Sequence, residues 1–245
     1  MSLRPRIEVI HDDDEILVVN KPAGVLTIAD RKGGESARDL LAAKHPELGG
    51  LRVVHRLDRD TSGVLVFART LNAQRSLTRQ LSERTTDKRY LAIVRGEPAD
   101  DRGLIDAPLR PHPRGDQRMV VSPRGRASQT EWEVIERLGG FALLRCRLLT
   151  GRQHQIRVHL SHVGLPLLVD ELYGSAGAFF LSSVKPGYRP SARHDERPLI
   201  GRQTLHAESI ALDHPIRSER LTFSAETPKD FRAVLSQLRK RRGLA

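Results

Sequence analysis

Chemically reactive side chains are concentrated in residues 55–63, which read HRLDRDTSG. This stretch holds two carboxylates, two guanidinium groups, an imidazole and two hydroxyls, and it lies between largely apolar runs at 51–54 and 64–67. Polar groups between two buried elements are unfavourable unless they hydrogen-bond to one another or to a ligand. Asp, Thr, Ser and Gly are also common turn residues, so a hydrogen-bonded β-turn and an active site both explain this composition.

The stretch resembles the HRLDxxTSG motif of the RluA-type pseudouridine synthases, which isomerise uridine within RNA. Four further segments resemble motifs of that family in the same order: VNKPAGV at 19–25, KRYLAIVRG at 88–96, TGRQHQIRVH at 150–159 and LHA at 205–207. The resemblance implies an RNA pseudouridine synthase that acts on ribosomal or transfer RNA. The alternative is a non-catalytic RNA-binding or ribosome-assembly protein on the same scaffold.

The resemblance also implies the catalytic residues. The motif's carboxylate falls on Asp58, the family's active-site tyrosine on Tyr90, and the arginine expected beside the carboxylate on Arg157. A guanidinium within about 4 Å would favour the charged carboxylate by on the order of 4 kcal/mol at an effective dielectric constant near 20, which opposes the effect of burial. Tyrosine is a poor base with its ordinary pKa of about 10, so packing of the Tyr90 ring against uracil is the main role that we expect. The presence of all three residues favours the enzyme over the pure binder.

Other polar side chains of these motifs are predicted to contact RNA. Arg56 resembles the family arginine that helps to extrude the target nucleotide, and its planar cation can fill the vacated stack. Thr61, Ser62 and Gly63 are expected to shape the turn. The remaining predicted RNA contacts are Lys21, His55 (which also shapes the turn), Arg152, Gln153 and His154.

Neither a metal nor a cofactor is predicted. Isomerising uridine breaks the N1–C1′ bond and rejoins the base through C5, which requires no redox group. His154, His159 and His162 lack the i, i+4 pair of a zinc-binding helix and a carboxylate at the required spacing. The acidic run at 12–14 is typical of a solvated hairpin tip. A metal-dependent nuclease or hydrolase, the third class considered, therefore lacks a convincing ligand cluster.

The charge of the chain indicates a polyanionic partner. Lys and Arg number 41 against 30 Asp and Glu, which gives a formal net charge of +11 and a sequence pI of about 10.6. Neutralising phosphates releases counterions, so this excess favours RNA, although some proteins are basic for solubility alone. Aromatic residues make up only 4 %, which argues against a platform of stacking rings.

Composition limits the broad class of the protein. With 38 % apolar and 29 % charged residues, the 245-residue chain is typical of a globular protein rather than a disordered or membrane chain. No apolar run approaches the roughly 18–20 residues of a spanning helix, and the N-terminus does not read as a signal peptide. The single cysteine, Cys146, cannot form an intramolecular disulfide and reads as a core residue. We expect a cytoplasmic monomer.

Apolar periodicity and turn residues predict the elements that position these groups. Gly139 and Gly140 join a predicted hairpin, and Ser36 caps a predicted helix. Residues 98–113 read as loop-rich, with basic turns at 111–118 and 123–126. Strands are expected at 7–11, 15–19, 51–54, 64–67, 88–95, 127–138, 141–149, 204–212 and 220–224, and helices at 36–44, 72–84, 153–162 and 228–240.

Because strands outnumber helices and most are joined by hairpins, the predicted fold class is α+β with a mainly antiparallel sheet. The resemblance implies the pseudouridine synthase fold, a bent mixed sheet with a central cleft flanked by helices and loops. One catalytic domain is expected over 1–245, with a long insertion at 174–203 and a C-terminal helix and basic tail at 228–245. The motifs begin within the first twenty residues, so no N-terminal S4-type RNA-binding domain is expected. The RNA target, the modified uridine and the atom attacked stay open.

Overall fold

The computed structural model describes residues 6–30, 35–44, 50–115, 117–174, 176–185, 187–189, 195–217 and 219–243. The chain divides into two compact units. Unit 1 comprises residues 1–90 and 206–227, and unit 2 comprises residues 91–205 and 228–245. The chain passes between the units within β5 (Asp87–Arg95), at the start of β11 (Leu205–Asp213) and after residue 227.

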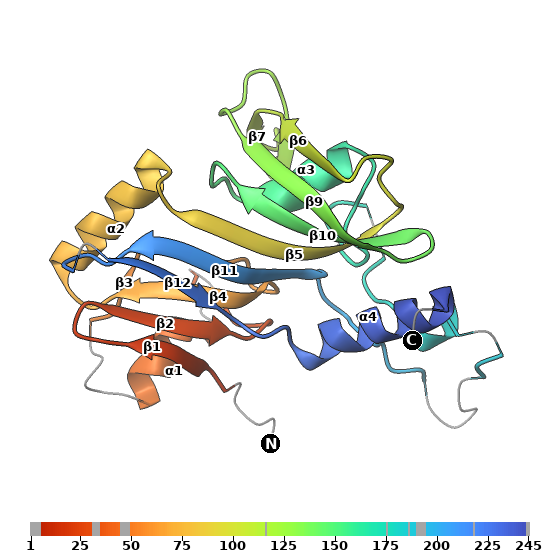
Figure 1. Ribbon diagram of the computed structural model, residues 1–245, viewed down its shortest axis with the longest axis horizontal. Helices are drawn as coiled ribbons and strands as arrows, with labels where there is room; N and C mark the ends of the chain where they lie inside the picture. Colours follow the sequence, from red (N-terminus) through yellow and green to blue (C-terminus); the bar gives the residue numbers. More distant parts are fainter. Residues whose placement is uncertain are drawn as a thin grey trace. The chain divides into compact units, whose positions relative to one another are not determined.

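Unit 1 is built around β4 (Ser62–Ala68), which is buried along its whole length (Figure 1). A continuous apolar run is typical of a strand covered on both faces, and residues 64–67 supply one. Strand β4 pairs antiparallel with β2 and β3 and parallel with the start of β11. The other strands are β1 (Glu8–Asp12), β2 (Ile16–Lys21), β3 (Arg52–Val53) and β12 (Arg220–Ser224); β1 pairs with β2, and β12 with β11.

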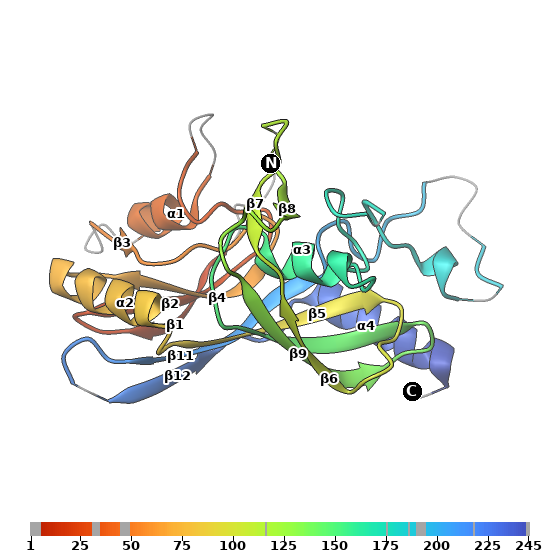
Figure 2. The same cartoon turned by 90° about the horizontal axis from the view of Figure 1, so that it is seen from above.

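The described part of unit 1 also contains the helices α1 (Ala37–Lys44) and α2 (Leu71–Glu83) (Figure 2). Ser36 Oγ accepts a hydrogen bond from the amide of Asp39, so the predicted cap of the first helix is confirmed. Thr70 caps α2 in the same way, through the amide of Ala73. The buried face of α2 includes Ala73 and Leu77, which join the apolar cluster of β2, β4 and β11. Helix α2 therefore packs on the strands that hold residues 55–63 in place.

The turn between β1 and β2 differs from the solvated tip that the acidic run predicted. Asp13 Oδ2 accepts hydrogen bonds from His11 Nε2 (2.8 Å), His214 Nε2 (3.1 Å) and Arg217 (3.1 Å). Its Oδ1 accepts from the backbone amides of Glu15 and Ile16. Asp13 is therefore a structural centre that ties this turn to the turn between β11 and β12. Asp12 and Asp14 are exposed, as a solvated tip implies, but the expectation fails for Asp13 because two of its donors, His214 and Arg217, lie some 200 positions away in the sequence.

Unit 2 contains the predicted hairpin, formed by β9 (Gln129–Arg137) and β10 (Phe141–Leu148). Gly139 and Gly140 both have positive φ, as a two-residue hairpin turn requires. The loop-rich reading of 98–113 was wrong, since β6 (Arg102–Asp106) pairs there with β9. Its glycine and charged residues conceal the strand signal. In addition, β7 (Leu109–Pro111) and β8 (Met119–Val121) form a short hairpin beside α3 (Gln155–His162) (Figure 2).

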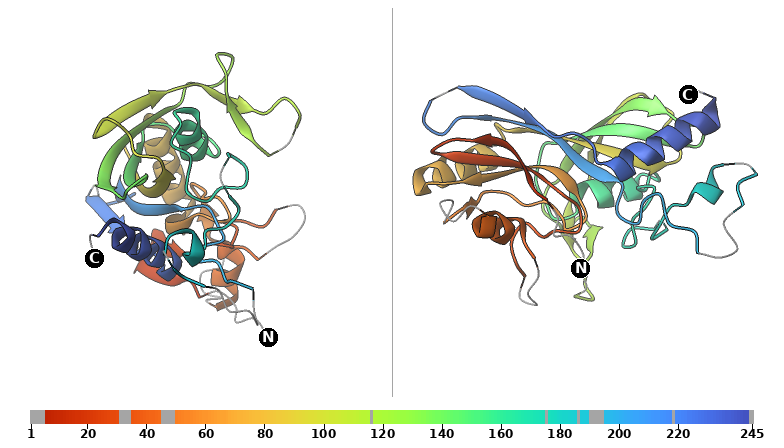
Figure 3. Two further views of the ribbon diagram at one scale, coloured as in Figure 1. Left: turned by 90° about the vertical axis from the view of Figure 1, so that its right-hand side faces the viewer. Right: turned by 90° about the horizontal axis from the view of Figure 1, so that it is seen from below.

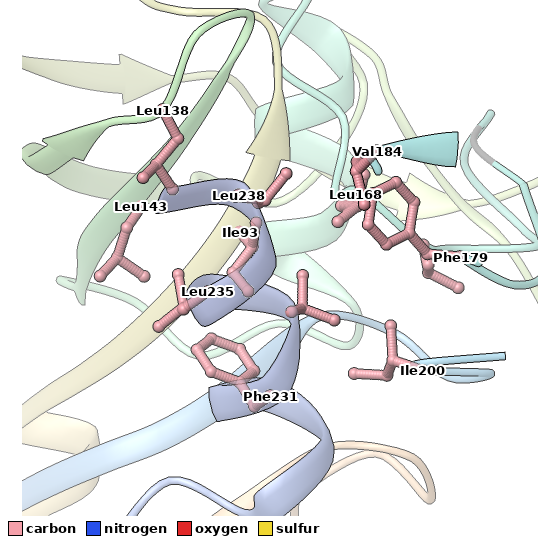
Figure 4. Close-up of a cluster of buried hydrophobic side chains, with 12 residues drawn as sticks. Ile93, Leu138, Leu143, Leu168, Phe179, Val184, Ile200, Phe231, Leu235 and Leu238 are labelled. Carbon is pink, nitrogen blue, oxygen red and sulfur yellow. The ribbon is translucent and has the colours of Figure 1, made fainter. Parts of the chain in front are cut away.

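Helix α4 (Lys229–Arg242) closes the main core of unit 2 (Figure 3). Its apolar face, which includes Phe231, Leu235 and Leu238, packs against Ile93 and Leu143 (Figure 4). The long insertion contributes to the same core through Phe179, Val184 and Ile200, and contains the short helix η2 (Leu181–Ser183). The described part of the insertion is therefore a packed element, not only a surface loop.

The predicted α+β class with a mainly antiparallel arrangement is confirmed. Cys146 lies fully buried on β10, and burial raises the pKa of its thiol to about 12, as a core residue would show. Within the described ranges, no helix is long and apolar enough to cross a bilayer.

Candidate active site

The segment after β2 holds residues 55–63 through a buried ammonium group. Lys21 is fully buried, and its Nζ donates to the carbonyls of Val25 (2.7 Å), Pro22 (2.9 Å) and Arg59 (3.0 Å). The amide of Gly24 donates to the same Arg59 carbonyl at 3.0 Å. The segment after β2 thus wraps around the Lys21 ammonium group, and these hydrogen bonds fix the backbone of Arg59, the residue next to Asp58. This burial argues against the direct RNA contact that the sequence predicted for Lys21.

The backbone of Asp58 is held on both sides. Thr27 Oγ1 accepts from the amide of Leu57 and donates to its carbonyl, both at 3.1 Å. On the other side, the amide of Thr61 donates to the carbonyl of Asp58 at 3.2 Å, which closes a tight turn. Leu57 is buried and Asp58 is half-buried. The carboxylate of Asp58 therefore projects from a turn whose position is set by its neighbours.

The LHA segment supports the end of the turn. Nε2 of His206 lies 3.1 Å from the carbonyl of Ala225, so this nitrogen carries the proton and Nδ1 accepts from the Ser62 hydroxyl at 3.0 Å. Gly63 has φ of +117°, and a Cβ at this position would lie 2.1 Å from the carbonyl oxygen of Ala207. Only glycine allows β4 and β11 to approach so closely. These contacts agree with the turn-shaping role expected for Ser62 and Gly63.

Tyr90 lies within electrostatic range of Asp58, and both belong to unit 1. Burial raises the pKa of the Tyr90 phenol well above its ordinary value, and the negative charge of Asp58 raises it further. The phenol is therefore protonated at physiological pH and is a poor base. Stacking and hydrogen-bond donation are the functions that this environment permits.

Two further titratable groups lie close to Asp58 and Tyr90 in the sequence, His55 and Lys88. His55 Nε2 accepts from the amide of Val66 at 3.1 Å, and burial together with the nearby Lys88 charge lowers the pKa of His55 to about 3. The ring is thus neutral and anchors the turn to β4. Burial also lowers the pKa of Lys88, which points to the same face of β5 as Tyr90 because residues two apart share a face. Lys88 was missed as a candidate, although its place two residues before Tyr90 signals it. The Arg56 side chain is exposed.

Arg157 lies on α3 in unit 2 and pairs with a carboxylate that the sequence did not single out. Its Nε and NH2 atoms lie 2.7 and 2.9 Å from the two oxygens of Asp170, a bidentate pair in which both side chains are buried. The guanidinium carbon lies 5.0 Å from the centre of the Tyr173 ring. The pairing of Arg157 with Asp58 would join the two units and stays a prediction.

The three predicted RNA contacts before α3 are arranged differently from a continuous helix. The helix was predicted from 153 but begins at Gln155, because His154 adopts a left-handed conformation with φ of +53°. Its Nδ1 lies 2.7 Å from the Tyr173 hydroxyl. Arg152 makes long contacts of 3.3 and 3.4 Å with the carbonyl of Ala127, and Gln153 is exposed. Arg152 and Gln153 thus stay candidates for RNA contact.

Buried polar residues fix α3, and sequence reasoning did not single out Gln155 among them. Gln155 accepts from Thr150 Oγ1 (2.8 Å) and from the amide of Arg152 (3.0 Å), and donates to Thr130 Oγ1. His159, one of the three histidines weighed as metal ligands, uses both ring nitrogens for Thr130 and the carbonyl of Ala107. Among the described residues, no group of three or more His, Cys, Asp or Glu is placed to hold a metal ion.

Comparison with known proteins identifies the family. The model of the RNA pseudouridylate synthase family matches residues 15–162. The chain is 41 % identical over 239 residues to ribosomal large subunit pseudouridine synthase D of Xanthomonas campestris, covering 96 % of this chain and 70 % of the relative. The enzyme of the same name from Pseudomonas aeruginosa is 37 % identical, with 96 % and 73 % covered.

Solved structures agree with this result. Human RNA pseudouridylate synthase domain containing 4 matches with a TM-score of 0.70 and 25 % identity over 95 % of this chain and 93 % of that chain. Human RNA pseudouridylate synthase domain containing 1 matches with a TM-score of 0.69 and 28 % identity over 91 % and 84 %. The resemblance read from the motifs and the fold expected from it are confirmed. The chain therefore belongs to the RNA pseudouridylate synthase family and is an enzyme that isomerises uridine in RNA.

Proposed function

We propose that this enzyme isomerises specific uridines in structured RNA, ribosomal RNA before transfer RNA, with Asp58 as the catalytic carboxylate. Relatives that match nearly the whole chain are named as ribosomal large subunit pseudouridine synthases, which supports the choice of RNA. The observation that carries the role of Asp58 is its place on a turn fixed through Thr27 and Thr61, within electrostatic range of Tyr90. A general turn would not need a half-buried carboxylate beside a buried phenol.

In the proposed reaction, the ionised Asp58 serves as nucleophile or ion-pair stabiliser while the N1–C1′ bond breaks. The protonated Tyr90 packs against the detached uracil and holds it while it turns. C5 then bonds to C1′ and loses its proton to water, and N1 takes up a proton from water. Arg56, exposed on the same turn, occupies the place of the extruded nucleotide. Arg157 is proposed as the supporting cation, with its geometry set by Asp170.

The substrate's phosphates are proposed to meet the basic turns. The net charge of +11 favours a polyanion, and the turns at 111–118 and 123–126 carry arginines on and beside the β7–β8 hairpin. Arg152 and Gln153 lie at the N-terminal side of α3, where a phosphate would also be favoured by the helix dipole. The single catalytic domain over 1–245, the monomeric state and the cytoplasmic location also remain proposals.

The test uses transcribed RNA incubated with the protein in EDTA, followed by chemical mapping of pseudouridine. We expect product with the unaltered protein and none with Asp58→Asn, whose RNA binding should be retained. Asp14→Asn, which alters an exposed carboxylate of unit 1, is the matched control and should retain activity. RNA binding without product in the unaltered protein would support the non-catalytic alternative, and RNA cleavage would support a nuclease.

A further inference from the structure

Tyr173 immediately precedes the long insertion, and its side chain contacts two candidate functional residues, Arg157 of α3 and His154 just before that helix. Its ring lies 5.0 Å from the guanidinium carbon of Arg157, and its hydroxyl lies 2.7 Å from Nδ1 of His154. Its backbone carbonyl accepts from Ser161 Oγ at 2.8 Å, which fixes the residue to the other end of the helix. All of these residues belong to unit 2, so their arrangement is internal to one compact unit.

The hydroxyl of Tyr173 also reaches the β7–β8 hairpin. The amide of Met119, the first residue of β8, donates to Tyr173 Oη at 2.9 Å. Because an amide N–H can only donate, Oη accepts from Met119, and it forms a second hydrogen bond with Nδ1 of His154. One hydroxyl therefore joins the residue that precedes α3 to a strand of the hairpin that carries the basic turn at 111–118.

Apolar packing supports the same connection. Leu109 and Met119 of the hairpin form a small buried cluster with Val158 of α3, and the Tyr173 ring packs against this cluster. The guanidinium of Arg157 is thus placed by two groups at once, the carboxylate of Asp170 on one side and the face of this ring on the other. The bidentate pair with Asp170 sets the direction in which the Arg157 guanidinium points. The face of the Tyr173 ring limits rotation of the guanidinium out of its own plane.

We propose that Tyr173 is a positioning residue for the isomerisation, with two separable functions. The ring holds the Arg157 guanidinium, and the hydroxyl holds the β7–β8 hairpin and His154 in register for RNA binding. This inference rests on the proposed function, because it gives Arg157 a part in the chemistry and the basic hairpin a part in binding. The inference adds that the single side chain of Tyr173 positions both Arg157 and the β7–β8 hairpin.

The two functions predict different kinetic results for two substitutions. Tyr173→Phe keeps the ring and removes the hydroxyl, so KM for RNA should rise by about fivefold, the loss expected for one or two hydrogen bonds, while kcat stays within about twofold. Tyr173→Leu removes the ring as well, so kcat should also fall by about tenfold, as expected for a lost contact between a partly desolvated cation and an aromatic face.

Tyr188→Phe and Tyr188→Leu are the matched controls, because Tyr188 also lies in unit 2 with a cation, Lys185, 5.9 Å above its ring, and it has no part in the proposed site. These variants should leave kcat and KM unchanged. A readout independent of activity is amide hydrogen exchange at Met119, which should accelerate in Tyr173→Phe and not in the Tyr188 variants.

The outcomes distinguish this inference from the proposed function. If the unaltered protein forms no pseudouridine, the proposed function fails. If the unaltered protein is active but Tyr173→Phe changes neither KM nor exchange at Met119, the inference is overturned. It is also overturned if Tyr173→Leu lowers kcat no more than Tyr173→Phe does. A variant with equal losses in folding stability and activity, restored together by lower temperature, would also overturn it, because that result describes a merely structural residue.

Discussion

Replacing Lys21 by methionine tests how the active-site turn is held. Methionine has a similar length but no ammonium group, so the carbonyls of Pro22, Val25 and Arg59 lose a buried donor. The Arg59 carbonyl keeps the hydrogen bond from the Gly24 amide, so the cost falls on the carbonyls of Pro22 and Val25. Each acceptor that loses its buried donor costs about 1–3 kcal/mol, and removal of a buried charge returns part of that sum, so we expect a net destabilisation of about 2–4 kcal/mol.

The assay is urea unfolding followed together with RNA binding. With a typical urea dependence of about 1–3 kcal/mol per M, the unfolding midpoint should fall by roughly 2 M. The salt dependence of RNA binding at a temperature where the variant is folded should be unchanged, because a buried lysine releases no counterion from RNA. Lys229→Met, which removes an exposed lysine, is the matched control and should leave the midpoint in place.

The reasoning would be refuted by the opposite pattern. An unchanged midpoint, with the slope of log K against log salt reduced by about one, would show that Lys21 neutralises a phosphate, as its place in the motif first indicated. A fall in the urea midpoint with unchanged RNA binding would support the role of Lys21 as a buried donor that holds the active-site turn.

Two other predictions concern the same unit. Gly63→Ala forces a Cβ to 2.1 Å from the Ala207 carbonyl oxygen at a φ of +117°, so we expect a loss of about 2–5 kcal/mol in urea unfolding, and a loss below about 0.5 kcal/mol would contradict the close approach of β4 and β11. For Asp13, burial raises the pKa, but hydrogen bonds from His11 and from the amides of Ile16 and Glu15 outweigh it and hold the pKa well below its usual range. Its stabilising contribution is therefore present above about pH 4, the ordinary value, and is lost as the pH falls further, so Asp13→Asn should destabilise the protein at pH 7 and by less at pH 3. Urea unfolding at both pH values measures this, and an equal effect at the two would be inconsistent with it.

Local patterns predicted those elements whose signal is local. Helix α2 and the β9–β10 hairpin were predicted within two residues, because an apolar period and a pair of glycines are read within a few positions. The start of α3 was placed two residues too early. His154 is bent out of the helix by geometry that includes its hydrogen bond to Tyr173, nineteen positions away, and no local pattern contains that partner.

In the candidate site, too, contacts between residues distant in the sequence could not be predicted. The motifs indicated which residues carry chemistry but not what each one touches. Lys21 was predicted to contact RNA, whereas its ammonium group donates to the backbone carbonyl of Arg59, 38 positions further along the chain. Arg157 has its bidentate carboxylate in Asp170, which lies outside every motif considered. Such long-range pairs arise from the topology of the strands and helices, and this topology cannot be read from a single sequence.

The most direct measurement of the central claim follows the hydrogen at C5 of uridine. Rejoining the base through C5 expels that hydrogen, so RNA labelled there with tritium should release label to water when the enzyme acts. We predict release in EDTA by the unaltered protein, and a fall of about 10⁴-fold or more for Asp58→Asn, with RNA binding retained. Release by Asp58→Asn at the rate of the unaltered protein would contradict the assignment of Asp58 as the catalytic carboxylate.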